Sequence, residues 1–245
     1  MELLELLIII LLAGMLSILA QYMGLLTFDG AAVSLIIGLI IGLFGSVDWL
    51  IILIIFTALG FAATLAGIAK KRDRGLQEGK HGERMYKNVA AVGISPCVFA
   101  VLSFAMGGES GIHYELFCIA YISSITVAAA DTIASEAGVR DKRVWLITTF
   151  RRVEPGVDGG ISMMGTLLAL AAALVTGMIG WVLIFGFVFT PLFFVPVAAG
   201  MAGCFADSVL GATAEARGYI SKYTNNAVTA MFGAVFATAV YIFLF

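Results

Sequence analysis

Eight long apolar stretches constrain the fold of this 245-residue chain more than any other feature. A helix needs about 20 mainly apolar residues to cross the hydrocarbon core of a bilayer, where its backbone groups are satisfied internally. Composition agrees, because 61% of the residues are hydrophobic and 12% are charged, whereas soluble domains carry about 25% charged residues. We therefore expect an all-α polytopic membrane helix bundle, with residues 1–245 forming a single integral membrane domain. The expected spans are residues 3–22, 30–45, 48–67, 89–107, 114–136, 160–179, 181–206 and 227–245.

The basic residues indicate how these spans are oriented. All 14 lysines and arginines fall within residues 70–87, 140–152 and 217–222, which follow the third, fifth and seventh expected spans. Eight spans place these three segments on one side of the membrane, and basic loops stay on the cytoplasmic side. We therefore expect both termini outside, the protein in the cytoplasmic membrane, and any site among these segments facing the cytoplasm. The net charge of −2 gives no reason to expect nucleic acid as a partner.

Two parts of the chain resemble each other weakly. Gly-Ile-Ser opens the fourth and sixth spans, at residues 93–95 and 160–162, and Ala-Asp-Thr or Ala-Asp-Ser closes the fifth and seventh, at 130–132 and 206–208. All four motifs are then expected at the cytoplasmic border. Internal repeats in membrane proteins often place a site at the repeat interface. A match of so few residues also arises by chance, and that alternative stays open.

Polar residues gather at the end of the fifth span. On a helix, Thr132, Ser135 and Glu136 lie within about 140° of Asp131, so we expect one continuous polar arc. Asp207 begins a second arc at the end of the seventh span. Ionisable residues within spans favour a functional role. The structural alternative is an interfacial helix end, where carboxylates reach water at little cost.

Cationic and glycine-rich segments are expected at the same border. Arg151 and Arg152 precede a glycine-rich turn and a helix start, where backbone N–H groups favour anions. Carboxylates for Mg²⁺ beside cations for phosphate are what phosphoryl transfer from a nucleotide requires. The alternative is that these loops only set topology or touch anionic lipid. The sequence contains no standard nucleotide-binding motif, serine-hydrolase elbow or zinc-protease motif.

Five motifs resemble those of a known family, in the family's order and over most of the chain. They are RMYKNVAAVG (84–93), AADTIASEAG (129–138), VEPGVDGGISMMGT (153–166), FADSVLGA (205–212) and KYTNNAV (222–228). The chain thus resembles the integral membrane family that includes plant phytyl-phosphate kinase and animal transmembrane protein 19. More distantly it is similar to CTP-dependent polyprenol kinases and phosphatidate cytidylyltransferases.

This resemblance implies a kinase that uses CTP and Mg²⁺ to convert an isoprenoid monophosphate, of phytyl or geranylgeranyl type, into its diphosphate. It also implies that the aspartates of the Asp-Thr and Asp-Ser motifs, Asp131 and Asp207, bind Mg²⁺ and nucleotide phosphates. The chain departs from the family pattern at Asp158, where Asn is usual, and at Asn226, where an acid is usual nearby. Those departures leave the roles of both residues open.

We expect the nucleotide and the lipid phosphate to meet at this border. Asp131, Glu136 and Asp207 are the expected catalytic residues and Mg²⁺ ligands, with Asp158 as a further metal ligand. The expected nucleotide- and phosphate-binding residues are Lys87, Asn88, Ser95, Thr132, Ser135, Arg151, Arg152, Gly160, Ser162 and Ser208.

Other functions fit parts of the same pattern. A CTP-dependent cytidylyltransferase that makes a CDP-linked lipid needs the same carboxylates and phosphate-binding groups. A lipid or ion transporter predicts carboxylates along a path across the bilayer, and a structural membrane protein predicts no dependence on them. Chain length of the lipid, nucleotide preference and oligomeric state, a homodimer included, are open at this stage.

Overall fold

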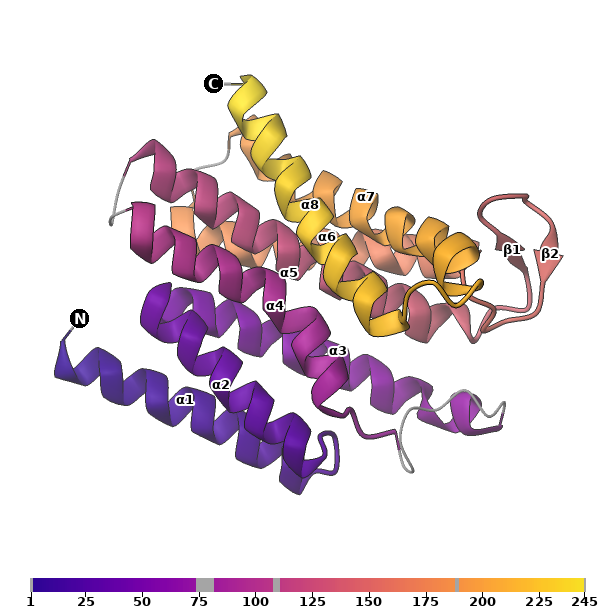
Figure 1. Ribbon diagram of the computed structural model, residues 1–245, viewed down its shortest axis with the longest axis horizontal. Helices are drawn as coiled ribbons and strands as arrows, with labels where there is room; N and C mark the ends of the chain where they lie inside the picture. Colours follow the sequence, from indigo (N-terminus) through magenta and orange to yellow (C-terminus); the bar gives the residue numbers. More distant parts are fainter. Residues whose placement is uncertain (1, 74–81, 108–110, 188–189, 245) are drawn as a thin grey trace.

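The computed structural model describes residues 2–73, 82–107, 111–187 and 190–244, without the side chains of 69–71 and 73. Most of the basic segment 70–87 therefore lies outside the described side chains. Within the described residues the chain forms eight α-helices arranged as a bundle (Figure 1). They are α1 (Leu3–Tyr22), α2 (Phe28–Phe44), α3 (Val47–Asp73), α4 (Tyr86–Leu102), α5 (Ile112–Gly138), α6 (Met163–Phe185), α7 (Phe194–Leu210) and α8 (Lys222–Leu244).

The helices confirm the prediction of an all-α polytopic membrane protein. Seven described segments are long and apolar enough to cross a membrane, and α2, with 17 residues, is shorter. The boundary expected between the sixth and seventh spans is wrong. Helix α6 continues to Phe185 and ends at Gly186, whose φ of 69° stops a helix readily. Helix α7 follows a short 3₁₀ turn that begins at Pro191.

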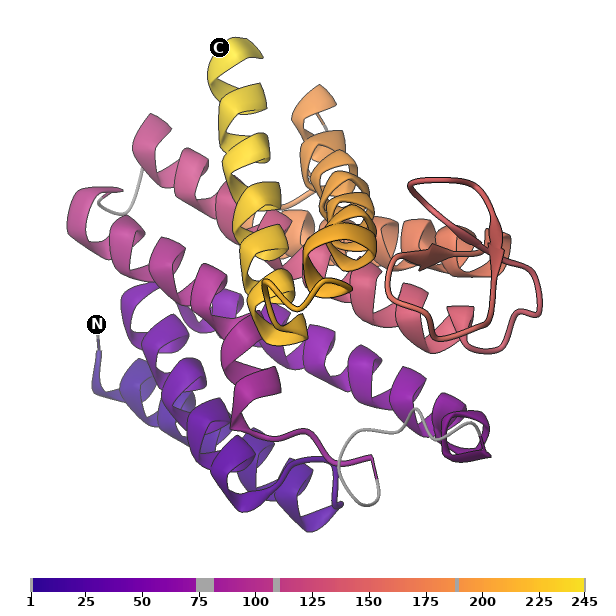
Figure 2. The same cartoon turned by 45° about the vertical axis from the view of Figure 1, so that its right-hand side comes forward.

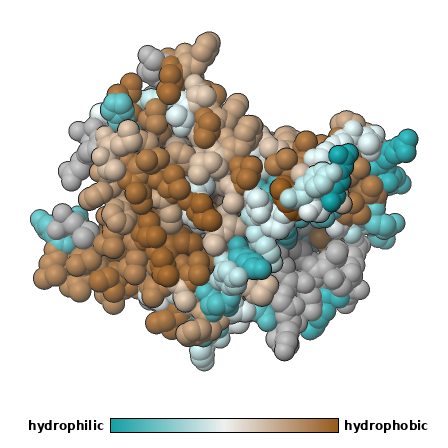
Figure 3. All heavy atoms as spheres, in the orientation of Figure 1, coloured by the Kyte–Doolittle hydropathy of each residue, from teal (hydrophilic) through white to brown (hydrophobic). Residues whose placement is uncertain are grey.

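Successive helices run in alternating directions, so the two ends of the bundle differ. The described chain ends, at residues 2 and 244, lie at one end, and the end of α3, the start of α4 and the α5–α6 and α7–α8 connections lie at the other (Figures 1 and 2). The segments 140–152 and 217–222 thus share one end with the described residues of segment 70–87, as the helix count predicts. The surface is apolar along the helices and hydrophilic at this polar end (Figure 3). That the polar end faces the cytoplasm stays a prediction.

Helix α5 forms the centre of the bundle. Every residue from Phe117 to Ala130 is buried, and α5 contacts α3, α4, α6, α7 and α8. Glycines let the neighbouring helices approach closely, because a Cβ at Gly203 or Gly233 would lie 2.5 or 2.3 Å from a methyl group of Val127. Small residues have this function in many membrane helix pairs. The packing fixes the rotation of α5 and therefore the direction of its polar end.

A small sheet that the sequence did not predict connects α5 to α6. Strands β1 (Val144–Leu146), β2 (Arg152–Val153) and β3 (Gly160–Ile161) form an antiparallel sheet in the order β2-β1-β3. The expected helix start at residue 160 is therefore wrong. The helix begins after Ser162, whose Oγ accepts the backbone N–H of Gly165 at 3.0 Å and caps the first turn.

A turn before this sheet is stabilised locally. The carboxylate of Asp141 accepts the backbone N–H of Arg143 at 2.9 Å. This bond holds the pKa of Asp141 below its usual value. The turn leads from the end of α5 into β1, so the sheet begins directly beside the polar end of α5.

Candidate functional site

A cavity of about 300 Å³ opens at the polar end of the bundle. Its walls come from the end of α5, the loop through β3 into α6, the end of α7, the π-helical turn η3 (Gly211–Glu215) and the start of α8. Seven residues expected at a site line it, namely Asp131, Ser135, Asp158, Gly160, Ser162, Asp207 and Ser208. We call this cavity the carboxylate pocket.

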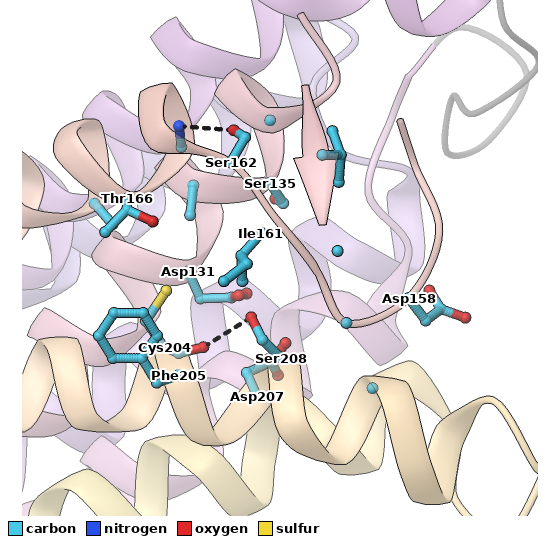
Figure 4. Close-up of a pocket in the computed structure, with 18 of the residues that line it drawn as sticks. Asp131, Ser135, Asp158, Ile161, Ser162, Thr166, Cys204, Phe205, Asp207 and Ser208 are labelled. Atoms are coloured by element: carbon cyan, nitrogen blue, oxygen red, sulfur yellow. Dashed lines mark hydrogen bonds between the residues drawn. The ribbon is translucent and has the colours of Figure 1, made fainter. Parts of the chain in front are cut away.

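Asp131 and Asp207 form the centre of the pocket. Their side chains point toward one another from α5 and α7, within hydrogen-bonding reach (Figure 4). The close approach of the two helices brings them together, because Gly200 and Gly203 of α7 pack directly on Thr126 and Val127 of α5. Two carboxylates at this separation repel each other when both are ionised. The pair therefore needs either a shared proton or a cation between its oxygens.

Asp158 and Glu215 add two more carboxyl groups to the pocket lining. Asp158 lies on the loop before β3, apart from the aspartate pair (Figure 4). Glu215 ends the π-helical turn after α7, and it interacts electrostatically with Asp158, Asp131 and Lys222. Lys222 is the one lysine or arginine among the described lining residues. Four carboxyl groups face one ammonium group, so the pocket favours a cationic ligand or a metal-bound anion.

Two glycines bring the Asp158 loop onto the end of α7. Gly159 has a φ of 76°, and a Cβ there would lie 2.6 Å from the carbonyl oxygen of Ser208. A Cβ on Gly211 would lie 2.9 Å from the backbone nitrogen of Gly159. Only glycine permits this backbone contact without displacement. The loop and the π-helical turn therefore meet directly, and they close one side of the carboxylate pocket.

Glu136 and Thr132 do not join Asp131, so the expected single polar arc is wrong. Glu136 is 6% exposed, and its Oε1 accepts the hydroxyl of Thr64 from α3 at 3.1 Å. The same hydroxyl oxygen accepts Nη2 of Arg84 at 3.1 Å. An arc of about 140° is wider than the face of α5 that borders the pocket, so its far edge turns toward α3. We call Glu136, Thr64 and Arg84 the arginine cluster.

Five other expected phosphate ligands also lie outside the pocket lining. Lys87 is exposed near the ring of Tyr86, and Arg151 and Arg152 are exposed in and beside strand β2. The Asn88 side chain accepts the backbone N–H of Met85 at the start of α4. Ser95 is fully buried inside α4. The short strands and the orientation of α4 place these residues away from the pocket, and the sequence reveals neither feature.

The sequence predicts no role for four residues in and around the pocket, namely Lys222, Asn225, Asn226 and Thr229. Glu215, Lys222 and Asn226 line the pocket, and Asn225 and Thr229 contact Asp207 from α8. A signal for two of them does exist, because Asn225 and Thr229 are polar residues four positions apart, a spacing that puts both on one face of a helix. Their position opposite Asp207 depends on the packing of α7 against α8.

The oxygen atoms of the aspartate pair suit Mg²⁺. Among the described residues no group of three or more His, Cys, Asp or Glu side chains is arranged to hold a metal ion. The expected metal site of Asp131, Glu136, Asp207 and Asp158 together is therefore wrong. Mg²⁺ keeps several water ligands and often binds through one or two carboxylates with substrate phosphates. Asp131 and Asp207 supply two carboxylates at one place in the pocket.

A separate apolar groove of about 200 Å³ runs between α3 and α6. Ala129 and Ile133 of α5 form its floor, and Gly60, Ala171 and Ala172 are among the small residues that line it. The groove lies on a different face of α5 from Asp131.

Comparison with known proteins places the chain among integral membrane proteins. Residues 11–239 match the family described as "Integral membrane protein DUF92". An uncharacterised membrane protein of Methanocaldococcus jannaschii is 35% identical over 214 residues, which cover 87% of this chain and 84% of that protein. The chloroplastic protein VTE6 of Arabidopsis thaliana is 31% identical over 188 residues, which cover 76% of this chain and 54% of the plant protein. No solved structure matches the chain.

Proposed function

We propose a function for the chain from one premise: it belongs to the DUF92 family of integral membrane proteins, which its match over residues 11–239 establishes. The chain acts as a CTP- and Mg²⁺-dependent kinase that converts an isoprenoid monophosphate into its diphosphate at the membrane border. One observation carries the proposal. The carboxyl groups of Asp131 and Asp207 lie within reach of each other in a pocket at the polar end of a membrane helix bundle.

Phosphoryl transfer needs few protein groups, and the pocket contains them. The γ-phosphoryl group leaves CTP, its bond to the β-phosphate oxygen breaks, and a new bond forms to an oxygen of the lipid phosphate. That acceptor oxygen is already ionised near neutral pH, so no strong general base is required. Catalysis in such reactions depends mainly on positioning and on electrostatic stabilisation.

Each pocket element has a task in this reaction. Asp131 and Asp207 would hold Mg²⁺, which neutralises charge on the transferring phosphates when bound. The N-terminus of α6, where Ser162 and Thr166 line the pocket, favours anionic oxygens through its N–H groups. The ammonium group of Lys222 offsets negative charge on the same side as Glu215.

The family motifs support an isoprenoid phosphate as substrate. The chain resembles a family that includes plant phytyl-phosphate kinase, and its similarity to the chloroplastic VTE6 protein agrees with that resemblance. A site at the bundle end, rather than at mid-membrane depth, favours an enzyme over a transporter.

The purified full chain in detergent tests the proposal. With Mg²⁺, CTP and phytyl or geranylgeranyl phosphate, it should release CDP and form the lipid diphosphate. Release of pyrophosphate with a CDP-linked lipid would instead identify a cytidylyltransferase. Absence of any product with CTP, ATP, GTP and UTP, across lipid phosphates of several chain lengths, would refute both.

A further inference from the structure

The start of α8 carries two buried polar side chains beside Asp207. Asn225 and Thr229 are each 1% exposed, one helical turn apart. Burying an amide or a hydroxyl without a hydrogen-bond partner is unfavourable. Both side chains instead contact Asp207 at the end of α7, and Thr229 makes its shortest hydrogen bond to the backbone oxygen of Asn225 in its own helix. Neither of them lines the pocket itself.

Asn225 links the two acidic segments of the pocket wall. Its Nδ2 donates to the backbone oxygen of Asp207 at 3.1 Å and to Oε2 of Glu215 at 3.0 Å. Both partners are oxygen acceptors, so the amide must present its NH₂ group to them. Its own Oδ1 is buried with no hydrogen-bond partner among the described residues. The Asn225 side chain thus donates to both Asp207 and Glu215, while its Oδ1 accepts no hydrogen bond from the described residues.

Thr229 contacts the carboxylate itself. Its Oγ1 lies 3.4 Å from Oδ1 of Asp207 and 3.0 Å from the backbone oxygen of Asn225. The hydroxyl therefore sits between the α8 backbone and the pocket aspartate. One carboxylate oxygen of Asp207, Oδ1, is therefore directed toward Thr229 of α8.

The π-helical turn makes this support necessary. Turn η3 interrupts the regular ladder directly after α7, and such turns are common at functional sites. It places Glu215 in the pocket wall, where Asn225 ties it back to Asp207. Without that tie, the two carboxylates lie on segments of different backbone geometry and would orient independently.

We propose that Asn225 and Thr229 are positioning residues that orient the carboxylates of Asp207 and Glu215 for a divalent cation held between Asp207 and Asp131. This inference rests on the proposed function. Groups that orient metal ligands from behind typically change metal affinity by about 10–100-fold when they are removed. Asn225 and Thr229 touch neither the cation nor the substrates, and they act through the two carboxylates.

Helix α8 offers a matched control for Thr229. Thr238 makes the same kind of bond, from its hydroxyl to the backbone oxygen of Ala234 at 2.9 Å, but it lies outside the pocket. Thr229→Val and Thr238→Val therefore remove equivalent hydroxyls from one helix, and Thr229→Ser retains the hydroxyl. Asn225→Gln keeps the amide group but moves it, and Asn225→Leu removes it.

Mn²⁺ binding to the detergent-purified chain, followed by electron paramagnetic resonance, tests the inference without requiring activity. Thr229→Val and Asn225→Leu should weaken Mn²⁺ binding about tenfold or more, while Thr229→Ser and Thr238→Val bind as wild type. Turnover assays should show a matching rise in the Mg²⁺ requirement, with KM for the lipid phosphate unchanged.

Two outcomes would overturn it. One is equal Mn²⁺ affinity in the Thr229→Val and Thr238→Val variants, and the other is a wild-type chain that binds no Mn²⁺. Loss of the proposed function has a different signature, since a chain without kinase turnover can still show the predicted order of Mn²⁺ affinities.

Discussion

Two carboxylates near the end of α5 meet opposite surroundings. Asp131 faces the carboxylate pocket, where it lies beside a second carboxylate, Asp207 of α7. Glu136, little more than one turn further, is buried against Thr64 of α3, whose hydroxyl oxygen also accepts a hydrogen bond from Arg84. The carboxylate pocket brings groups of like charge together around a cavity. In the arginine cluster, the Thr64 hydroxyl connects the guanidinium group of Arg84 to the carboxylate of Glu136.

The difference shows what separates a ligand site from a structural contact in a membrane helix. A carboxylate at the bilayer border is unusual in either case. The arginine cluster contains a positive charge of its own and joins α3 to α5. The aspartate pair instead places two carboxylates side by side, and a divalent cation bound there would offset their repulsion. The groups that surround each carboxylate, rather than its own polarity, therefore distinguish a ligand site from a structural contact.

The largest expected effect comes from the aspartate pair. Asp207→Asn or Asp131→Asn should lower kcat/KM for the kinase reaction about a hundredfold or more, because a direct metal ligand is lost. The melting temperature should stay level or rise, since the substitution relieves repulsion between adjacent carboxylates. Turnover and thermal unfolding in the same detergent measure both. Wild-type turnover in Asp207→Asn would contradict the assignment.

Substitutions in the arginine cluster should lower stability but leave turnover nearly unchanged. Thr64→Val removes the hydroxyl that Glu136 and Arg84 both use, and Glu136→Gln puts a buried NH₂ group in place of a carboxylate oxygen. The free energy of unfolding should therefore fall by about 1–3 kcal/mol in either variant. Turnover per folded molecule should change less than threefold, because neither residue lines the pocket. A thermal shift combined with an activity assay at low temperature separates the two effects. Loss of turnover without loss of stability would place Glu136 in the site after all.

A smaller effect is expected from the loop that closes the pocket. Gly159→Ala puts a Cβ against Ser208 and Ala212, so the Asp158 loop must move and turnover should fall several-fold. Gly218→Ala is the matched control, because Gly218 has a φ of 74° but open space around it. Both substitutions carry the left-handed backbone cost of about 1–2 kcal/mol. Equal turnover in the two variants would show that the loop contact is not needed.

The smallest effect is expected at the exposed arginines. Arg151→Ala and Arg152→Ala should change turnover less than threefold, because neither side chain lines the pocket and both are exposed to solvent screening. Steady-state assays at low and moderate salt check this. A tenfold rise in KM for CTP would return these residues to the phosphate site predicted from the sequence.

The sequence predicts the number and direction of the helices well, because long apolar runs and clustered basic residues are strong local signals. It also predicts that Asp131 and Asp207 lie together. It misplaces Glu136, since helical periodicity gives an angle around α5 but not which neighbour lies at that angle. The three strands contain only two or three residues each, too few to leave an alternating pattern in the sequence. The α8 contacts of Asn225 depend on how α7 packs against α8, for which no local pattern exists.

The central claim is that Asp131 binds a divalent cation whereas Glu136 has a structural role. Its most direct test is Mn²⁺ binding to wild type, Asp131→Asn and Glu136→Gln in detergent with CTP present, measured by electron paramagnetic resonance. The account predicts a bound Mn²⁺ signal in wild type and Glu136→Gln that is lost in Asp131→Asn. Retention of the signal in Asp131→Asn, or its loss in a folded Glu136→Gln protein, would contradict it.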